Sequence, residues 1–405
     1  MSEDNILDYK SEALKVVTFH LVFSENDLSE TNIRSTFQPK MAHQIFGPRE
    51  TIFGYKQLAI KLYYLHNSSK CFVKIEHSGK VEHIEADDIM QKLDPWLPTN
   101  YTTSEEEFVQ IVKNEKHNQM FGTVIHEFEK SAEVIAVPSR STTCKYKITQ
   151  CDLGDPLFQE YHQRFETYIT WFIDGANFID LNDERWLIFY MYEEYTHPVT
   201  GEVFITPIGF TTIYKFYSYP SGIRARISQF FILPTHQLRR LGSALYKTVF
   251  KHITQMPEIV DLTVEEPNES FQAMRDACDA VFLYDDIKEN NAGLYEESET
   301  IFLEYVQQFK FCKRQAWRLT DILRYRYAYI YSKQKSFLDG LFKRMEYQIE
   351  KEFGNHKRAK LDILEQQDPQ LLMAKQLEER FCAYSRVLDE IAQRFIYFRQ
   401  LLSEK

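Results

Sequence analysis

The spacing of apolar residues predicts short strands separated by turns in the first third of the chain. Residues 55–64 and 70–77 alternate apolar and polar side chains with the period of two that is typical of a half-buried strand. Residues 91–103 contain two prolines and are predicted to form a loop, because proline interrupts regular structure. These features indicate a mixed α/β domain over residues 1–140.

Helix and strand patterns alternate in a second region, residues 141–312. The order predicts an aromatic-rich helix, a two-strand hairpin, a third strand, a second helix and a last strand, over residues 158–178, 186–195, 203–219, 224–233, 240–255 and 259–264. The hairpin turn is expected near residues 198–201. Because the second helix lies between two strands, the order favours a parallel strand pair within a mixed α/β (α+β) sheet.

The last region, residues 313–405, has a helical pattern and contains only two glycines and one proline. Apolar residues near its end recur with a four-three spacing, which is one stripe of a long helix with a heptad-like seam. The stripe consists of Leu377, Phe381, Tyr384, Leu388, Ile391, Phe395, Phe398 and Leu402. We favour a helical hairpin or bundle that closes on itself over a helix that docks a partner.

Length and charge narrow the class of protein. At 405 residues the chain exceeds what one hydrophobic core usually fills, so two or three domains are expected. No apolar run approaches the roughly 18 residues that a membrane span needs. The 48 basic and 59 acidic residues give a net charge of −11, which disfavours a dedicated DNA-binding protein, since such proteins carry a basic face.

The charge is unevenly distributed along the chain. Residues 313–405 hold 19 basic and 13 acidic residues, a net of +6, which leaves 29 basic and 46 acidic residues, a net of −17, for residues 1–312. An acidic surface attracts cationic partners, and acidic residues also serve solubility alone. The sequence does not separate these two interpretations at this point.

The segment 224–276 carries the strongest chemical pattern. A predicted strand is followed by a loop at residues 235–241 and then by a helix. The first turn of a helix presents unpaired N–H groups and a partial positive charge, which bind phosphates, and Arg239 and Arg240 would add charge there. Gly242 would let a ligand approach the backbone closely. Alone, such a loop is also an ordinary helix start.

Four blocks of sequence make the pattern specific. The QxxRxG loop resembles the acetyl-CoA loop of the GNAT superfamily of N-acetyltransferases. The blocks FGYKQLAIKLYY, WFIDGANFIDLNDERW, ISQFFILPTHQ and TVEEPNESFQAMRD, in this order, resemble the catalytic subunit of type B histone acetyltransferase. The resemblance implies a GNAT core with a smaller N-terminal α/β domain and a C-terminal helical domain.

The resemblance also implies an acetyl-CoA site. Its strand would bond the pantetheine arm, its loop would hold the pyrophosphate, and two residues after the EEP turn would contact the acyl end. The residues are Phe230, Phe231, Ile232, Gln237, Leu238, Arg239, Arg240, Leu241, Gly242, Ser243, Asn268 and Phe271. This chain departs from the family at Leu238 and Arg240, where glycines are common. A Cβ at these places would crowd the phosphates, and Arg240 would compensate electrostatically.

Three acidic residues match the family's catalytic positions: Glu265 as general base, with Glu266 and Asp174 beside it. The chemistry asks for such groups independently, since acetyl transfer needs a neutral amine and a lysine has a pKa of about 10.4. A partly buried carboxylate cluster would accept the ammonium proton, because burial and like charges raise a carboxyl pKa toward neutrality. The alternative is that the EEP turn only begins the next helix.

A covalent acetyl-enzyme and a metal site are both disfavoured. Cys278 has Asp276 and Asp279 beside it, and adjacent acids raise the pKa of a thiol and weaken it as a nucleophile. We therefore expect direct attack in a ternary complex. The six cysteines and twelve histidines form no CxxC pair and no HExxH motif, so no metal is expected.

On the substrate side, the resemblance assigns histone contacts to Trp186, to the strand residues Tyr214, Lys215 and Phe216, and to Glu50. Arg49 departs from the family, which tends to be acidic in that loop. The aromatic side chains near Tyr214 fit either a two-faced core strand or a groove wall for a lysine stem, with help from cation–π contacts.

These observations lead to a functional hypothesis. We expect a histone acetyltransferase that uses acetyl-CoA to modify lysines of newly made histone tails, chiefly the fourth core histone. By resemblance, it would work with a WD-repeat histone-binding chaperone subunit in cytoplasm and nucleus. The alternatives are a GNAT enzyme for another amine, such as a protein N-terminus or a polyamine, and a non-catalytic subunit that binds histone or acyl-CoA.

Overall fold

The computed structural model describes residues 8–29, 33–136, 141–356 and 369–403. The chain forms two compact units, Met1–Glu265 and Glu266–Lys405. This division is coarser than the three predicted domains, whose boundaries stay predictions.

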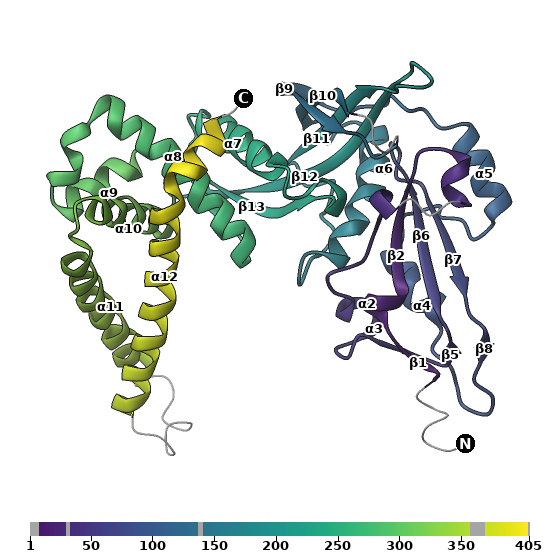
Figure 1. The fold of residues 1–405 in the computed structure, drawn as a ribbon, viewed down its shortest axis with the longest axis horizontal. Coiled ribbons are helices and arrows are strands. Elements are labelled where there is room, and N and C mark those ends of the chain that lie inside the picture. Colours follow the sequence, from purple (N-terminus) through teal and green to yellow (C-terminus); the bar gives the residue numbers. More distant parts are fainter. Residues whose placement is uncertain (1–7, 30–32, 137–140, 357–368, 404–405) are drawn as a thin grey trace. The chain divides into compact units, whose positions relative to one another are not determined.

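A six-stranded sheet forms the centre of the first unit (Figure 1). In spatial order its strands are β14 (Ile259–Val264), β13 (Gly222–Ile232), β12 (Val203–Ser218), β11 (Trp186–Thr196), β10 (Ser141–Cys151) and β9 (Thr123–Glu133). All neighbours are antiparallel except β13 and β14, which are parallel. The predicted strands and the predicted parallel pair are confirmed. The strand β9 precedes residue 140, so the sheet extends across the predicted boundary.

A second sheet of four strands lies in the N-terminal part of the first unit. Its order is β3 (Thr36–Phe37), β2 (Val17–Val22), β6 (Ala59–Leu65) and β7 (Cys71–Glu76). The helix α5 (Glu105–Lys113) packs on it through Phe108 and Val112. Two small ladders pair β1 (Lys10–Glu12) with β4 (Thr51–Phe53) and β5 (Tyr55–Lys56) with β8 (Gly79–Lys80).

An aromatic core joins the two sheets of the first unit. The ring of Tyr168 lies 4.5 Å from that of Tyr64 on β6 and 5.8 Å from that of Phe231 on β13. Trp171 meets Phe19 of β2 edge-on at 5.5 Å. These side chains are fully or almost fully buried. Many of the aromatic residues of the first unit therefore form its hydrophobic core.

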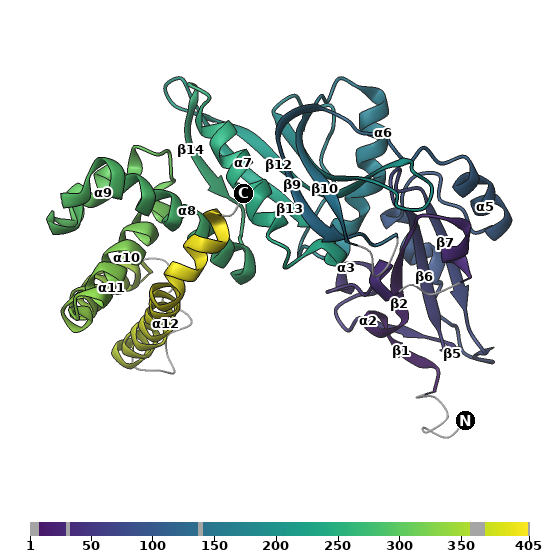
Figure 2. The ribbon, with the colours of Figure 1, turned by 45° about the horizontal axis from the view of Figure 1, so that its top comes forward.

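Helices complete the first unit (Figure 2). They are α2 (Ala13–Val16), α3 (His43–Phe46), α4 (Ile89–Leu93), α6 (Pro156–Phe165) and α7 (Leu241–Thr254), with 3-10 turns at η1 (Glu25–Leu28), η2 (Ile33–Ser35), η3 (Asp94–Trp96), η4 (Glu166–Trp171) and η5 (Pro234–His236). The helix predicted at residues 240–255 is confirmed as α7, which buries the side chains of its four-residue apolar stripe.

Three local predictions are wrong. The predicted loop 91–103 begins in α4, because the Asp88 side chain caps that helix. The predicted helix 158–178 ends as an α-helix at Phe165 and tightens into η4, whose residues are all buried and so lack an amphipathic pattern. The predicted strand 55–64 is two strands, because Gln57 adopts a φ of 49° between them.

The second unit is helical. Its elements are α8 (Glu269–Asn290), η6 (Ala292–Glu296), α9 (Glu299–Gln307), α10 (Lys313–Ile330), α11 (Gln334–His356) and α12 (Pro369–Ser403). The predicted seam is confirmed: its residues on α12 are buried or half-buried. The helix α12 packs against α8, α10 and α11, so the region closes on itself as favoured. No helix among the described residues is long and apolar enough to cross a membrane.

Candidate active site

The strands β13 and β14 separate part-way along their length. Their parallel ladder runs from Ile223 to Ile227 on β13, opposite Ile259 to Val264, whereas β13 continues to Ile232 in register with β12. A bulge marks the point of separation: Ile213 and Thr212 of β12 face Ile227 and Gln229, and Ser228 is the extra residue. Side chains at this point are therefore aimed differently from those of a regular strand.

Glu265, the predicted general base, is attached to this bulge. Its backbone N–H donates to the Ile227 carbonyl over 2.9 Å, and its Oε2 accepts a hydrogen bond of 2.7 Å from Ser228 Oγ. Ser228 was not singled out from the sequence, because only the bulge aims its hydroxyl at Glu265. Glu265 and Glu266 are both exposed, so the chain alone does not provide the partial burial expected for the base.

Asp174, the third predicted acid, contacts the N-terminal part of the unit. Its Oδ1 lies 3.0 Å from His43 Nε2, and His43 Nδ1 lies 3.7 Å from Glu50 Oε1. The Glu50 carboxylate also accepts a hydrogen bond of 2.6 Å from the Ala42 N–H. Within the described residues, the ion pair of Asp174 is with His43. A predicted catalytic residue and a predicted substrate contact thus share one histidine.

The loop after Asp174 is tied to β13. Gln229 Nε2 donates to the Asn177 carbonyl over 2.8 Å, and Gln229 Oε1 accepts from Thr212 Oγ1 over 3.2 Å. Gln229 is buried and follows Ser228 directly. The bulge on β13 therefore anchors the Glu265 carboxylate through one residue and the Asp174 loop through the next.

The predicted phosphate loop keeps the backbone that glycines usually supply. Leu238 and Arg240 have φ values of 60° and 65°, in the left-handed region that favours glycine. The Leu238 side chain is fully exposed, so its Cβ points away from the rest of the chain. The loop therefore adopts the left-handed backbone conformation although Leu238 and Arg240 both carry side chains.

The start of α7 fits an anionic group. Arg240 is the N-cap residue and makes no side-chain capping bond, and the first turn contains no acidic residue. The N–H groups at Leu241, Gly242 and Ser243 belong to this first turn, where a phosphate is favoured by their partial positive charge. Among the described residues, no group of three or more His, Cys, Asp and Glu side chains is placed to hold a metal ion.

The side chain of Arg239 turns toward strands β10 and β11. Its Nη2 donates to Tyr146 Oη over 3.0 Å and lies 3.4 Å from Glu193 Oε2, which is buried. A buried carboxylate behind the loop thus holds the guanidinium, and the role of Arg239 toward the phosphates stays a prediction. Gln237 is also engaged, since its Nε2 donates to the Ile232 carbonyl over 2.8 Å.

The other predicted cofactor residues divide between the two units. Phe230, Phe231 and Ile232 lie on β13 and face Thr211, Phe210 and Gly209 of β12. In the second unit, Asn268 caps α8 by accepting a hydrogen bond of 2.8 Å from the N–H of Phe271. The side-chain cap of α8 is thus Asn268, and the EEP turn precedes it. Cys278 on α8 is buried, as expected of a structural cysteine.

Four of the predicted substrate contacts form a row across two neighbouring strands, with Trp186 on β11 and Tyr214, Lys215 and Phe216 on β12. Trp186 faces Tyr214, which faces Arg226, and the Trp186 and Tyr214 rings lie 4.7 Å apart. Phe216 meets Tyr214 edge-on at 4.6 Å and is partly exposed. Lys215 alternates with these rings and donates its N–H to the Arg185 carbonyl. The row is therefore an accessible wall as well as core packing.

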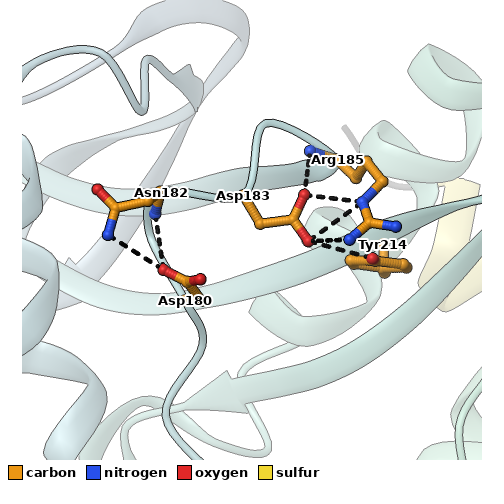
Figure 3. Close-up of polar contacts among 5 residues, drawn as sticks. All are labelled: Asp180, Asn182, Asp183, Arg185 and Tyr214. Atoms are coloured by element: carbon orange, nitrogen blue, oxygen red, sulfur yellow. Dashed lines mark hydrogen bonds and ion pairs between the residues drawn. The ribbon is translucent and has the colours of Figure 1, made fainter.

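The chain's own cations already contact this wall. The guanidinium of Arg226 lies 4.6 Å from the Phe216 ring centre, and that of Arg185 lies 4.9 Å from Tyr214. Figure 3 shows Asp183 accepting hydrogen bonds from Arg185 and from Tyr214 Oη, which lies 3.1 Å away. The Arg185 guanidinium and N–H, with Tyr214, hold the pKa of Asp183 well below its usual range.

Comparison with known proteins decides the family. The histone acetyl transferase HAT1 N-terminus model matches residues 9–174, and the acetyltransferase (GNAT) family model matches residues 151–275. The human histone acetyltransferase type B catalytic subunit is 33% identical over 328 residues, which cover 80% of this chain and 76% of the relative. The chain belongs to the family of type B histone acetyltransferase catalytic subunits. The mouse subunit is 34% identical over 329 residues, and that of Candida albicans is 32% identical over 301 residues.

Family membership confirms the resemblance and the fold class. The acetyltransferase has a mixed α/β GNAT core, preceded by the family's N-terminal region and followed by helices. A solved aminoglycoside acetyltransferase from an uncultured soil metagenomic sample aligns with 33% of this chain and 84% of its own, at 18% identity and a TM-score of 0.24. The roles of the individual site residues stay predictions.

Proposed function

We propose that this acetyltransferase transfers the acetyl group of acetyl-CoA to lysine side chains of newly synthesised histone tails, chiefly that of the fourth core histone. The names of its relatives support the substrate class. The observation that carries the chemistry is the hydrogen bond of 2.7 Å from Ser228 to Glu265, which holds a carboxylate where β13 and β14 separate.

The phosphate loop and the first turn of α7 fit the cofactor. Two left-handed residues and an uncapped helix start present backbone N–H groups of residues 241–243 to a pyrophosphate. Acetyl-CoA, when bound, supplies an acetyl group that is activated as a thioester. The backbone of β13 near Ile232 would align the extended arm, and an N–H there would donate to the thioester oxygen.

Glu265 removes the proton that blocks the substrate lysine. An ammonium group has no lone pair with which to attack, so it must lose a proton to a carboxylate within hydrogen-bond reach. Ser228 holds Oε2 of Glu265, which fixes the orientation of the carboxylate, and Oε1 accepts the proton. Glu266 and Asp174 add negative charge that attracts the cationic tail. The neutral amine would then attack the thioester carbonyl directly in a ternary complex: an N–C bond forms, the C–S bond breaks, and the departing thiolate takes up the proton that the attacking nitrogen loses, while Glu265 keeps the first proton.

The row of aromatic side chains guides the substrate. The aliphatic stem of a lysine packs well on the faces of Trp186, Tyr214 and Phe216, which keeps its amine pointed along β12. Arg185 and Arg226 occupy cation positions on Tyr214 and Phe216, so the wall binds the stem rather than the charge. Glu50, held by the Ala42 N–H, is the acidic contact for the remainder of the tail.

The test of the base is the Glu265→Gln variant. Turnover at neutral pH should fall by roughly a hundredfold or more, the usual contribution of a positioned general base, with little change in acetyl-CoA binding. The measurement is release of free thiol with a histone-tail peptide. Glu258→Gln, an exposed carboxylate just before the other end of β14, is the matched control and should keep full turnover.

Calorimetry with acetyl-CoA separates the alternatives. Tight cofactor binding without thiol release would identify a non-catalytic subunit, and release with a polyamine or a free N-terminus in preference to the histone tail would identify another amine acceptor. Full turnover by a folded Glu265→Gln variant would refute the base assignment. For the biological setting we propose a WD-repeat histone-binding chaperone as partner, in cytoplasm and nucleus, which co-purification from fractionated cells tests.

A further inference from the structure

A buried carboxylate lies directly behind the phosphate loop. Glu193 is on β11, opposite Tyr146 of β10, and only 2% of its side chain is exposed. Tyr146 Oη donates a hydrogen bond of 2.6 Å to its Oε2. A carboxylate at this depth is costly unless it is paired and hydrogen-bonded, so its partners are part of the structure.

Two partners of Glu193 lie in or just before the phosphate loop: Arg239 in the loop and His236 before it. His236 Nε2 lies 3.4 Å from Glu193 Oε1, and Arg239 Nη2 lies 3.4 Å from Oε2. His236 is itself buried, and its Nδ1 lies 2.9 Å from Thr235 Oγ1. Burial alone would raise the pKa of Glu193, but His236, Arg239 and Tyr146 outweigh it and hold that pKa below its ordinary value. The carboxylate therefore stays ionised and holds both loop residues.

The loop residues alternate in direction around this anchor. Arg239 turns inward to Glu193 and Tyr146, whereas Leu238 before it and Arg240 after it are exposed. Both exposed residues have positive φ, a conformation that strains a residue with a Cβ. Such backbone persists only where the surrounding structure holds it in place. Arg239 is the one residue between them, and its side chain is held.

We propose that Glu193 is a positioning residue for cofactor binding: it acts through Arg239 and His236 to hold the left-handed loop whose N–H groups bind the pyrophosphate. The inference rests on the proposed use of acetyl-CoA. In this chain, the contacts of Glu193 with Arg239 and His236 would stabilise the loop conformation that glycines usually allow. Arg239 then serves the phosphates indirectly, through the backbone, rather than by touching them.

Two variants separate tethering from direct contact. Glu193→Gln removes the charge that holds Arg239, and Arg239→Met removes the guanidinium. If the loop is tethered, each variant raises the Kd for acetyl-CoA by roughly tenfold, the effect of losing one buried charge-assisted hydrogen bond, and the double variant is no weaker than the weaker single one. The KM for the histone peptide should stay unchanged, and so should the kcat at saturating acetyl-CoA.

A truncated donor sharpens the test. S-acetyl-pantetheine lacks the pyrophosphate, so its KM should be the same for the wild type and both variants. Glu194→Gln, the next residue on β11, is the matched control: Glu194 pairs with Lys147 at 2.5 Å instead of with the loop. Tyr146→Phe keeps the ring but removes one bond to Glu193, and it should give a smaller loss in the same direction even if Glu193→Gln folds poorly.

The outcomes are distinct. Weaker acetyl-CoA binding by Arg239→Met with normal binding by Glu193→Gln and Tyr146→Phe would show direct phosphate contact and overturn the proposal. Additive losses in the double variant would do the same. A wild-type protein that binds no acetyl-CoA would instead remove the proposed function on which the inference rests.

Discussion

Leu238 and Arg240 hold backbone conformations that ordinarily belong to glycine. Their side chains are exposed, so packing does not explain why these residues are tolerated. Each loses about 1 kcal/mol to left-handed strain, while a glycine would lose roughly as much to the larger freedom of the unfolded chain. Because these two costs are nearly equal, leucine and glycine at position 238 should give similar free energies of unfolding, whereas a stiffer side chain should lower the free energy of unfolding.

We therefore expect Leu238→Gly to leave the free energy of unfolding within about 0.5 kcal/mol of the wild type, and Leu238→Val to lower it by about 1 kcal/mol or more, because a β-branched residue resists positive φ. Urea unfolding measures both. Leu157→Val on α6 is the control, since Leu157 is also exposed but lies in a helix. Equal stability of both valine variants would contradict this account.

A second residue-scale feature is the buried pair of His162 and Glu166. His162 Nε2 lies 3.5 Å from Glu166 Oε2, and neither atom has another hydrogen-bond partner among the described residues. Burial raises the pKa of Glu166 to about 8, although the Ile179 N–H opposes it, and burial lowers the pKa of His162 to about 3. At neutral pH a protonated Glu166 can donate to a neutral His162.

The raised pKa of Glu166 has a defined sign for stability. The folded state prefers the neutral carboxyl, so its contribution is fully present below pH 4.5 and is lost as the pH rises toward about 8. Glu166→Gln keeps the neutral form at every pH. The free energy of unfolding of this variant, relative to the wild type, should rise by about 1.4 kcal/mol per pH unit between pH 5 and 7.5.

Denaturant unfolding across that pH range checks the prediction. His162 titrates in both proteins, so its opposite effect at lower pH largely cancels in the difference. Glu160→Gln, an exposed carboxylate on α6, the helix that carries His162, shows how much slope an ordinary surface position produces. A flat difference for Glu166→Gln would mean that the carboxyl is ionised inside the folded protein.

At the scale of elements, apolar spacing was sufficient to predict a helix or strand where the apolar residues are also buried. The helix at 240–255 is marked by an apolar stripe that the structure buries, and the strand at 259–264 by an apolar run of which Ile259 and Leu262 are buried. The η4 turn was not predictable, because residues buried on every side carry no periodic signal. Nor was the inward turn of Arg239 predictable, since its partner Glu193 lies 46 positions earlier and meets it only in the folded sheet.

The α12 helix offers a direct test of its buried seam. Leu388 is 1% exposed, so Leu388→Ala should lower the free energy of unfolding by about 2–5 kcal/mol through lost burial and a residual cavity. Ile396→Ala, at a position that is 67% exposed on the same helix, should cost well under 1 kcal/mol. Calorimetry distinguishes them. Similar losses would show that the seam is not the face that packs.

At the scale of the whole molecule, charge is the feature that sequence alone left undecided. The net of −17 over residues 1–312 suits a cationic tail, yet the row of aromatic side chains carries Arg185 and Arg226. We therefore expect any attraction of the tail by the acidic residues to act at longer range rather than at the rings themselves.

Long-range attraction is sensitive to salt, because the Debye length falls from about 10 Å at 0.1 M to about 3 Å at 1 M. The kcat/KM for a histone-tail peptide should fall several-fold as salt rises from 50 to 500 mM, mainly through slower association. A small uncharged amine is the control and should change little. A peptide kcat/KM that does not depend on salt would assign the acidic residues to solubility alone.

The buried bond between Glu193 and Arg239 also limits how this sequence can drift. Removing the arginine leaves the buried carboxylate with His236 and Tyr146 alone, and removing the carboxylate leaves Arg239 with Tyr146. Losing a hydrogen bond to a charged group costs about 1.5–3 kcal/mol, against a total stability of roughly 5–15 kcal/mol for a typical domain. A lineage that loses the arginine is thus under pressure to lose the carboxylate as well, or to restore glycines in the loop. Positions 193, 238, 239 and 240 should consequently change as a group among related enzymes.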